Sequence, residues 1–479
     1  MKYEHYDLVV VGTGFASSFF LKKYLSKTDQ KKKVLVLEKG HFFPSAERLK
    51  ILRGQPSSYK KYESHWYNNI VNPNKEKVWQ FSTSYGGSSN CWWGCTPRFM
   101  PSDFKMKSLF GIEQDWPVTY EELDPYYYEA EEIMSISGPD NTPFPRKGKY
   151  PLPAHSFSLV DKILHKTYGT QYISQPTARA SRPLNKRNGC MAFSTCHTCP
   201  VDAKFTIENS GMSIYQDNRV ELLYGCSVYS MDIENNVVKT ILFQKDGKEY
   251  SVKAEAFVLG ANPFFNVNIL LNAGDKNPLT GVGFGEQLGM QALIYLDGMS
   301  NVGGSSWVNA NGYMLYDGAH RKDHAACLIE VNNAPYNIRV ERGKYLNMAS
   351  FRMVFEDLPL QSNYITTSEN KHVPVAHFKD RSAYTLKAVE QMKIKLPEIL
   401  SCLPVEDIKH LPPEPNEGHI LGGTRMSRDK TTGVVDSHLI HHQYRNLFVL
   451  GAGAFTTYGP SNPTLTVCAL SLFAADKVF

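Results

Sequence analysis

The sequence has no apolar run long enough to form a membrane helix. Nowhere in its 479 residues do ~18 apolar residues follow one another, the length that a span requires. It also lacks a strong charge: 52 basic and 47 acidic residues leave a net charge of +5, too little over this length to indicate nucleic-acid binding. We therefore expect a globular protein without a membrane span or a nucleic-acid partner, long enough for two or more domains.

We expect no secretion signal at the N-terminus. The stretch "YEHYDLVVVGTG" predicts a strand almost at the first residue, with no apolar leader segment or small-residue cleavage site before it. This indicates a cytoplasmic protein, and disulfides are rare in that reducing compartment. The nine cysteines, an odd number, then favour free thiols or metal ligands over a disulfide framework.

The first motif predicts a dinucleotide site. An apolar strand, "LVVV", leads into Gly12, Gly14 and Ser17 at G-x-G-x-x-S spacing, followed by an amphipathic helix. Gly12 permits a tight turn, Gly14 lets the backbone approach a pyrophosphate, and the helix N-terminus offers free N–H groups to it. Glu38 ends the next strand, where an acidic residue binds ribose hydroxyls and disfavours a 2′-phosphate.

This fingerprint does not distinguish FAD from NAD. Its position at the N-terminus, and the length of chain beyond the ~150 residues of one nucleotide-binding domain, favour FAD. The extended form of FAD needs contacts from several segments of the chain.

A second motif, "STSYGGSSNCWWGCTPRFMPSDF", spans Ser82–Phe104. Gly86 and Gly87 permit unusual backbone angles and a close approach to a ligand. Ser88 and Asn90 add short polar groups, and the paired tryptophans add large rigid surfaces. By itself the pattern fits either a ligand-binding loop or a hydrophobic turn.

A third motif lies near the C-terminus. His419 precedes "LGGTRM", and Asn462 precedes Pro463 in a Gly/Pro turn that leads into an apolar helix. Histidine is the side chain best suited to proton transfer near neutral pH. His419 comes within reach of Asn462 if the chain folds back, and spacing alone leaves open whether His419 is a catalytic base or a hydrogen-bonded structural residue.

Together these motifs resemble the glucose–methanol–choline (GMC) oxidoreductases. The resemblance rests on G-G-S-S followed by Arg98, on the "DWPVTYEELDPYYY" segment with a capping box from Thr119 to Glu122, and on the C-terminal signature H-x6-M, "GVVD", "NLFV" and "NPTLT". It covers both ends and the middle of the chain. In the family, the residue matched by His419 takes the proton of a substrate hydroxyl, that matched by Asn462 is its partner, and flavin N5 accepts the hydride.

The resemblance implies an α/β fold: a Rossmann-like FAD-binding domain with an α+β, mixed-sheet substrate domain of GMC type. Residues 1–280 would form the first part of the FAD-binding domain, with a cap or loop insertion at about 45–205. Residues 281–412 would bind substrate, with a sheet over the reacting face of the flavin within Val354–Asp380, and residues 413–479 would return to the FAD-binding domain. The expected FAD contacts are Gly12, Gly14, Ser17, Glu38, Gly86, Gly87, Ser88, Asn90, Cys91, Val228, Gly451, Ala452, Pro463 and Thr464.

Cys91 stands where the branch similar to pyranose oxidase links a histidine covalently to its flavin. The sequence therefore excludes a histidyl link. A thioether through Cys91 and a non-covalent FAD both stay open, and the second is the simpler.

Cys190, Cys196 and Cys199 lie in the stretch "NGCMAFSTCHTCPVDAKF". Their C-x5-C-x2-C-P spacing suits three ligands of an iron–sulfur cluster, or a zinc site completed by His197, or a turn of packed thiols. Bacterial glucose and gluconate dehydrogenases of the GMC family carry a Cys-rich loop at about this place, with an inner spacing that differs by one residue. We assign no metal ligand with these alternatives open.

The sequence thus predicts an enzyme that uses FAD to oxidise a CH–OH group of a sugar, polyol or related alcohol. The electron acceptor, whether oxygen, a quinone or a redox protein, stays open. The alternatives are a flavin or iron–sulfur electron-transfer subunit, which needs no proton acceptor such as His419, a redox-neutral lyase on the same fold, and, more distantly, an NAD dehydrogenase.

Overall fold

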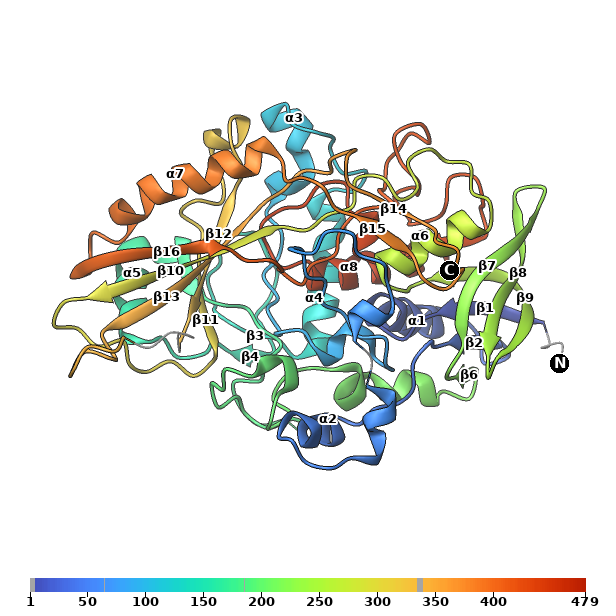
Figure 1. Cartoon of the computed structure of the whole chain (residues 1–479), viewed down its shortest axis with the longest axis horizontal. Helices are drawn as coiled ribbons and strands as arrows, with labels where there is room; N and C mark the ends of the chain where they lie inside the picture. Colours follow the sequence, from blue (N-terminus) through green and yellow to red (C-terminus); the bar gives the residue numbers. More distant parts are fainter. Residues whose placement is uncertain (1–4, 64, 185, 334–338) are drawn as a thin grey trace.

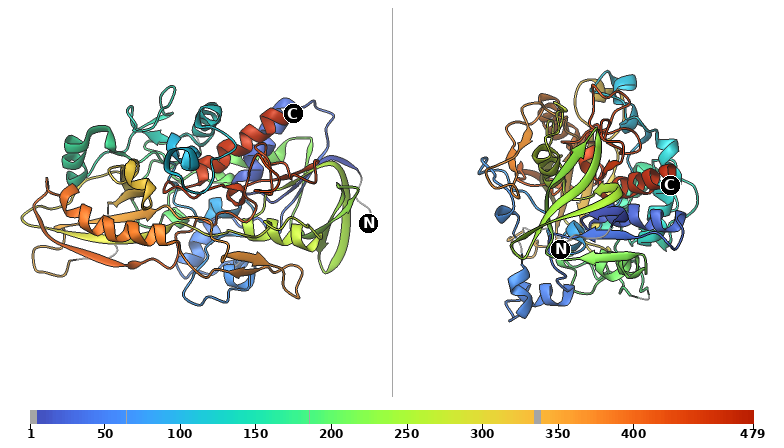
Figure 2. Two further views of the ribbon diagram at one scale, coloured as in Figure 1. Left: turned by 90° about the horizontal axis from the view of Figure 1, so that it is seen from above. Right: turned by 90° about the vertical axis from the view of Figure 1, so that its right-hand side faces the viewer.

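Two large β-sheets organise the chain in the computed structural model, which describes residues 5–63, 65–184, 186–333 and 339–479. Figures 1 and 2 show them at opposite ends of an elongated molecule, with the C-terminal helix α8 between them. The predicted α/β class is confirmed.

The first sheet has the order β6-β2-β1-β9-β8-β7, and β17 also pairs with β9. β6, β2, β1, β9 and β17 run parallel, whereas β8 and β7 continue the sheet as antiparallel strands. The core strands are continuously apolar because helices cover both faces, as parallel sheets require. The strands are β1 (Tyr6–Val11), β2 (Val34–Leu37), β6 (Val220–Leu223), β7 (Ser227–Glu234), β8 (Val237–Lys245), β9 (Lys248–Leu259) and β17 (Leu447–Val449).

Helices α1 (Phe15–Lys27) and α8 (Thr464–Val478) pack against each other beside this sheet, and α8 also packs on α4 (Tyr120–Met134). The predicted capping box is confirmed: the Thr119 side chain accepts from the backbone N–H of Glu122, whose carboxylate accepts from the N–H of Thr119. The N-termini of α1 and α8 both lie at the candidate site described below.

The second sheet has the order β16-β10-β13-β12-β11-β5, and all its strands are antiparallel. Alternate residues such as Met290, Ile329 and Phe351 face an apolar core that includes Met392 of helix α7. The strands are β5 (Tyr172–Ser174), β10 (Leu288–Leu296), β11 (Val308–Gly312), β12 (Cys327–Asn332), β13 (Met348–Phe355) and β16 (Val405–Pro413); α7 spans Ala383–Ile399 and α5 spans Leu159–Tyr168.

The opposite face of the second sheet carries a row of polar side chains. Gln291 pairs with Arg352, Arg352 with Glu330, and Glu330 with Asn311, so the row crosses four neighbouring strands. Directly opposed residues point to the same face of a sheet. Four polar groups therefore project together, away from α7.

The segment Val354–Asp380 does not form the predicted sheet over the reacting face. Beyond the end of β13 it contributes only the small two-stranded sheet of β14 and β15. The shorter elements are β3 (Ser137–Gly138), β4 (Leu152–Pro153), β14 (Tyr364–Thr366), β15 (Val375–His377), α2 (Ser45–Leu52), α3 (Met106–Phe110) and α6 (Pro263–Asn272).

The predicted domain boundaries stay a prediction. The strands of the first sheet come from residues 6–259 and 447–449, and most of the second sheet comes from residues 288–413. β5, from the segment predicted as an insertion, completes the edge of the second sheet. Within the described residues, no helix is long and apolar enough to cross a membrane.

A buried ion pair connects α4 to the segment that carries Asn462. The fully buried Arg98 donates from Nε to Glu131 at 2.7 Å and from Nη1 to Asp124 at 2.5 Å. Its backbone carbonyl accepts from the Ser461 hydroxyl at 3.1 Å. Arg98 therefore helps to hold Ser461, the residue before Asn462, in place.

We expect Arg98→Met to destabilise the fold by about 3–5 kcal/mol, because Glu131 loses its main cation while staying buried. Urea unfolding measures the change. Lys395→Met is the matched control: Lys395 pairs with Glu398 on the surface, where both side chains are more than half exposed. That pair contributes less than about 1 kcal/mol. Equal losses in both variants would contradict the role of the Arg98 pair.

Candidate active site

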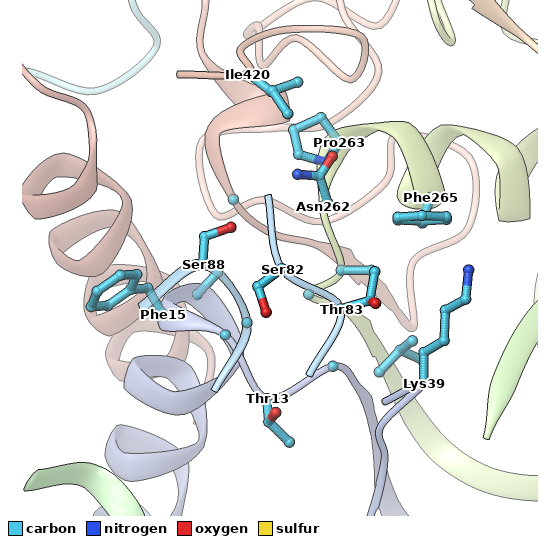
Figure 3. Close-up of a pocket in the computed structure, with 18 of the residues that line it drawn as sticks. Thr13, Phe15, Lys39, Ser82, Thr83, Ser88, Asn262, Pro263, Phe265 and Ile420 are labelled. Atoms are coloured by element: carbon cyan, nitrogen blue, oxygen red, sulfur yellow. The ribbon is translucent and has the colours of Figure 1, made fainter. Parts of the chain in front are cut away.

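A cavity of about 210 Å³ lies where the N-termini of α1 and α8 approach each other (Figure 3). Figure 3 shows Ser88 and Phe15 on one side of it, Lys39 and Phe265 on the other, and Asn262 above. Its lining comes from segments far apart in the chain: the turn after β1, the end of β2, residues 80–88, the start of α6, and residues 418–420, 451–452 and 463–467.

Two helix ends and two glycines make this cavity suitable for an anionic ligand. No side chain caps the N-terminus of α1 at Gly14 or of α8 at Pro463, so their first N–H groups are free of side-chain acceptors. A Cβ on Gly14 would project into open space, and one on Gly87 would lie 3.1 Å from the Gly14 Cα atom. The two loops approach closely because neither carries a side chain there.

Glu38, at the end of β2, is hydrogen-bonded to the turn that follows β1. Its carboxylate accepts from the Thr13 N–H at 2.9 Å, from the Thr13 hydroxyl at 2.6 Å and from the Gly40 N–H at 2.8 Å. The Thr13 hydroxyl accepts in turn from the Gly86 N–H. Burial raises the pKa of Glu38 against these hydrogen bonds, which lower it. The carboxylate thus stands at the cavity edge as an acceptor for hydroxyl groups.

Most of the predicted cofactor residues line this cavity, and their contacts to a cofactor stay predictions. Ser17 does not line it: its hydroxyl donates to the carbonyls of Val11 and Gly260, packing α1 against the sheet. Asn90 donates to the Tyr85 carbonyl and shapes the turn that begins at Gly86. The predicted residues that line it are Gly12, Gly14, Glu38, Gly87, Ser88, Val228, Gly451, Ala452, Pro463 and Thr464.

A second cavity, of about 570 Å³, adjoins the first and shares His419, Ser88 and Thr464 with it. His419 and Asn462 both line it, so the structure brings the predicted pair together. Cys91 lines this second cavity too, where burial raises the pKa of its thiol. The remaining walls come from the paired tryptophans and from the polar row of the second sheet.

Hydrogen bonding fixes the tautomer of His419. Its Nδ1 lies 2.6 Å from Oε1 of Gln287. The Gln287 amide nitrogen donates to the carbonyls of Gly459 and Ser461, so its oxygen must face the imidazole as an acceptor. Nδ1 therefore carries the proton and Nε2 keeps a lone pair. Burial lowers the pKa of His419 to about 4, although Glu417 acts to raise it. The imidazole is neutral near pH 7.

Asn462 is buried, with its carbonyl oxygen Oδ1 unpartnered among the described residues. Glu330 lines the same cavity. A buried polar atom without a partner is costly, and such atoms often mark a place where a ligand binds. Asn462 Oδ1 and the free nitrogen of His419 are thus two acceptors on one cavity.

Sequence reasoning missed the residues that surround this pair. Arg352 pairs with Glu417 through two hydrogen bonds of 3.0 and 2.7 Å, and Gln291 and Glu330 complete the polar wall. Gln291 interrupts the apolar run "LGMQALIYL", and Glu330 interrupts the apolar start of "CLIEVN". That interruption was the signal that could have found them.

The three cysteines of the loop line a separate, small cavity with Arg179 and Lys204. Burial raises the pKa of Cys196 to about 11. Across the described part of the chain, no three His, Cys, Asp or Glu side chains are grouped closely enough to hold a metal ion. Among the described residues there is therefore no preformed site for an iron–sulfur cluster or a zinc ion.

Comparisons with known proteins show which family the chain is similar to. Residues 370–471 match the GMC oxidoreductase family. The chain is 26% identical to the fructose dehydrogenase large subunit of Gluconobacter japonicus, over 98% of this chain and 97% of that protein. It is 24% identical to 2-methyl-1,2-propanediol dehydrogenase of Mycolicibacterium austroafricanum, covering 85% and 83%, and 22% identical to paromamine 6′-oxidase of Streptomyces fradiae, covering 99% and 91%.

The fold is similar to the crystal structure of pyridoxine 4-oxidase from Mesorbium loti, with a TM-score of 0.67 at 16% identity. The similarity covers 99% of both chains. The similarity therefore includes both sheets and extends over the whole fold of that structure.

We expect Glu38→Gln to weaken dinucleotide binding by about tenfold or more, since a bond to a charged acceptor contributes ~1.5–3 kcal/mol. The amide would also place a donor against the N–H groups of Thr13 and Gly40. The measurement is the ratio of nucleotide to protein after purification and dialysis. Glu249→Gln, an exposed carboxylate on β9, is the control. A Glu38→Gln protein that retains nucleotide as well as the control does would contradict this role.

Proposed function

The chain is a GMC oxidoreductase, and from this premise we propose that it oxidises a sugar-like or polyol alcohol with His419 as the base and Asn462 as its partner. The observation that carries the proposal is that both side chains line one cavity that adjoins the candidate cofactor cavity. The enzyme acts on a CH–OH group, as its relatives do.

The first cavity fits FAD, the cofactor general to this family. The free helix N-termini at Gly14 and Thr464 suit a pyrophosphate and a polar ring edge, and Glu38 suits ribose hydroxyls. When bound, FAD supplies the acceptor for the hydride that leaves the carbinol carbon.

The catalytic pair prepares the alcohol for that transfer. His419 accepts the hydroxyl proton at its free Nε2, because Nδ1 is already protonated and held by Gln287. A carbinol is a poor hydride donor until this proton is leaving. Asn462, fixed beside the imidazole, orients the substrate and keeps it from rotating away.

The polar wall supports a polyhydroxylated substrate. Gln291, Glu330 and Arg352 face the second cavity from one row of the sheet, and Glu414 and Glu417 add two more carboxylates. Relatives named for fructose, a propanediol and paromamine act on molecules with several hydroxyl groups. A cavity with this many acceptors and donors favours such a substrate over a simple apolar alcohol.

We expect His419→Ala to slow flavin reduction by about 10²–10⁴-fold, the usual contribution of a positioned base. The Michaelis constant should change much less. Stopped-flow bleaching of the flavin with a panel of sugars and polyols measures this. His5→Ala is the control, because His5 is exposed and lies beside Glu255, remote from both cavities.

Three outcomes would contradict the proposed function. His419→Ala protein that reduces its flavin at the wild-type rate would remove the assigned base. A flavin that no alcohol or sugar reduces would favour an electron-transfer subunit. Turnover without any electron acceptor would indicate a redox-neutral lyase.

The cysteine loop supports a second, separate proposal: Cys190, Cys196 and Cys199 bind an iron–sulfur cluster that passes electrons onward. The specific observation is that all three thiols line one small cavity with Arg179 and Lys204, cations that act to lower the pKa of Cys196 against the larger effect of burial. Among the described residues these thiols are not grouped closely enough to hold a metal ion, so binding requires them to approach one another.

The cluster proposal predicts iron and acid-labile sulfide in anaerobically purified protein, with broad visible absorbance that dithionite bleaches. Replacing the three cysteines with serine should remove the iron and leave the flavin bands. Wild-type protein with iron below about a tenth of an atom per chain would contradict the proposal.

A further inference from the structure

We propose that Lys77 and Glu286 are positioning residues for the oxidation: their buried ion pair fixes the backbone segment that carries the imidazole of His419. The inference rests on the proposed function of His419 as the base. It goes further by assigning a role to two residues that line neither of the two adjoining cavities.

His419 directly follows a turn that leaves it little restrained. The Gly418 N–H donates to the side-chain oxygen of Asn416 at 2.8 Å, and Gly418 has a φ of +75°. A Cβ at Gly418 would project into open space, so packing does not restrain this position. Glycine has more conformational freedom than any other residue. The position of His419 therefore depends on contacts on both sides of Gly418.

Two contacts hold the chain at His419 and after it. Gly285 and Leu421 exchange backbone hydrogen bonds, both of 2.9 Å, in an antiparallel bridge. Two residues further along the first of these segments, Gln287 accepts from Nδ1 of His419 at 2.6 Å. Neither contact reaches the chain before Gly418.

Glu286 supplies the contact before the turn. It is fully buried, and its Oε1 accepts from the Glu417 N–H at 2.6 Å. The same oxygen accepts from the ammonium of Lys77. Because Glu286 and Gln287 are neighbours in the chain, one dipeptide holds the segment on both sides of Gly418.

Lys77 extends this contact to Pro415. Its ammonium also donates to the carbonyl of Pro415 at 2.9 Å and to that of Val78 at 3.3 Å. An ammonium has three N–H donors, and with Glu286 these carbonyls provide three acceptors. The ring of Trp79 lies 4.4 Å from Nζ, a favourable place for a cation. Burial lowers the pKa of Lys77, and Glu286 acts to raise it. The contacts are those of a charged ammonium paired with a carboxylate.

Arg381 holds the backbone of the same dipeptide. Its Nη1 donates to the carbonyls of Glu286 and Gln287 at 2.8 and 2.9 Å. Both side chains of the dipeptide therefore project from a fixed backbone. A misplacement of about 1 Å can cost ~10²-fold in rate. The ion pair thus matters for the transfer of the substrate proton to Nε2 of His419.

A neutral-pair variant, Lys77→Met with Glu286→Gln, tests this because it removes both charges at once. Replacing both members of a buried ion pair with neutral groups is often nearly neutral for stability. With the panel alcohol that reduces the flavin fastest, we expect the reduction rate to fall by about 10–100-fold and the Michaelis constant to change by less than about threefold. The melting temperature and the flavin content should stay close to wild type.

The matched control is Lys23→Met with Glu129→Gln. This pair has an N–O distance of 2.6 Å, and both side chains are about one third exposed or less. It connects α1 to α4 and lines neither cavity. The control should keep the wild-type reduction rate.

A double-mutant cycle separates positioning from a general structural effect. In a His419→Ala background, the neutral-pair variant should cost less than about twofold, because no imidazole is left to hold. A loss as large as in the wild-type background would overturn the inference, and so would a neutral-pair variant that works at the wild-type rate. If His419→Ala itself does not slow flavin reduction, the proposed function fails; if it does and the neutral-pair variant does not, only this inference fails.

Glu286→Gln alone is the milder variant, and it decides the question if the neutral-pair protein does not fold. Lys77 keeps the Pro415 carbonyl in this variant, while the N–H of Glu417 loses its charged acceptor. A hydrogen bond to a charged acceptor is stronger than one to a neutral acceptor, so we expect a loss of about threefold or more in the reduction rate. A rate equal to that of the wild type would contradict the role of Glu286.

The tautomer of His419 gives a measurement that needs no substrate. Nitrogen NMR of protein labelled at its histidines distinguishes an imidazole protonated at Nδ1 from one protonated at Nε2, and the His419 signal is the one that His419→Ala removes. We expect a single Nδ1-protonated form in the wild type and a mixture of both tautomers in the neutral-pair variant. A His419 signal that is the same in both proteins would overturn the inference.

Discussion

The carboxamide of Gln287 is the contact on which the candidate site depends. It precedes β10 directly, so the second sheet holds it in place. Its oxygen accepts from His419 Nδ1, and its nitrogen donates to the carbonyls of Gly459 and Ser461. One planar group therefore fixes the tautomer of His419 and the backbone before Asn462. The distance between the two catalytic candidates is set by a rigid amide rather than by the loops that carry them.

The two sheets contribute different chemical groups to the candidate site. The first sheet and the N-termini of α1 and α8 form a cavity from backbone N–H groups and glycines, a surface suited to a charged and flat ligand. The second sheet offers side chains instead: Gln291, Glu330 and Arg352. Buried polar groups of this kind cost free energy unless each has a partner. Arg352 is paired with Glu417, and Glu330 accepts from Gln175, so the wall is held in place by these partners.

Local motifs predicted the parts of the site whose chemistry is local. The turn at Gly12 and Gly14, the acid at Glu38 and the capping box of α4 follow from spacing alone, because backbone angles and helix ends depend on neighbouring residues. The family resemblance added His419 and Asn462. The polar wall was missed, because Glu330 and Arg352 become neighbours only through strand pairing. Ser17 does not line the cavity but packs α1 on the sheet, the role that the third position of the fingerprint has, and its cofactor contact stays a prediction. The sheet expected within Val354–Asp380 was wrong because the strands covering the site lie in other segments.

The position of β17 has a consequence for how the protein is made. This strand pairs with β9, yet it is residues 447–449 of the chain, and α8 follows it to the end. The strands of the second sheet from β10 to β16 therefore lie in the chain between β9 and its partner β17. Domains usually fold as units during synthesis, but here the first sheet gains its β17 strand only after the chain has passed through most of the second sheet. The completion of one sheet is thus linked to the path of the chain through the other.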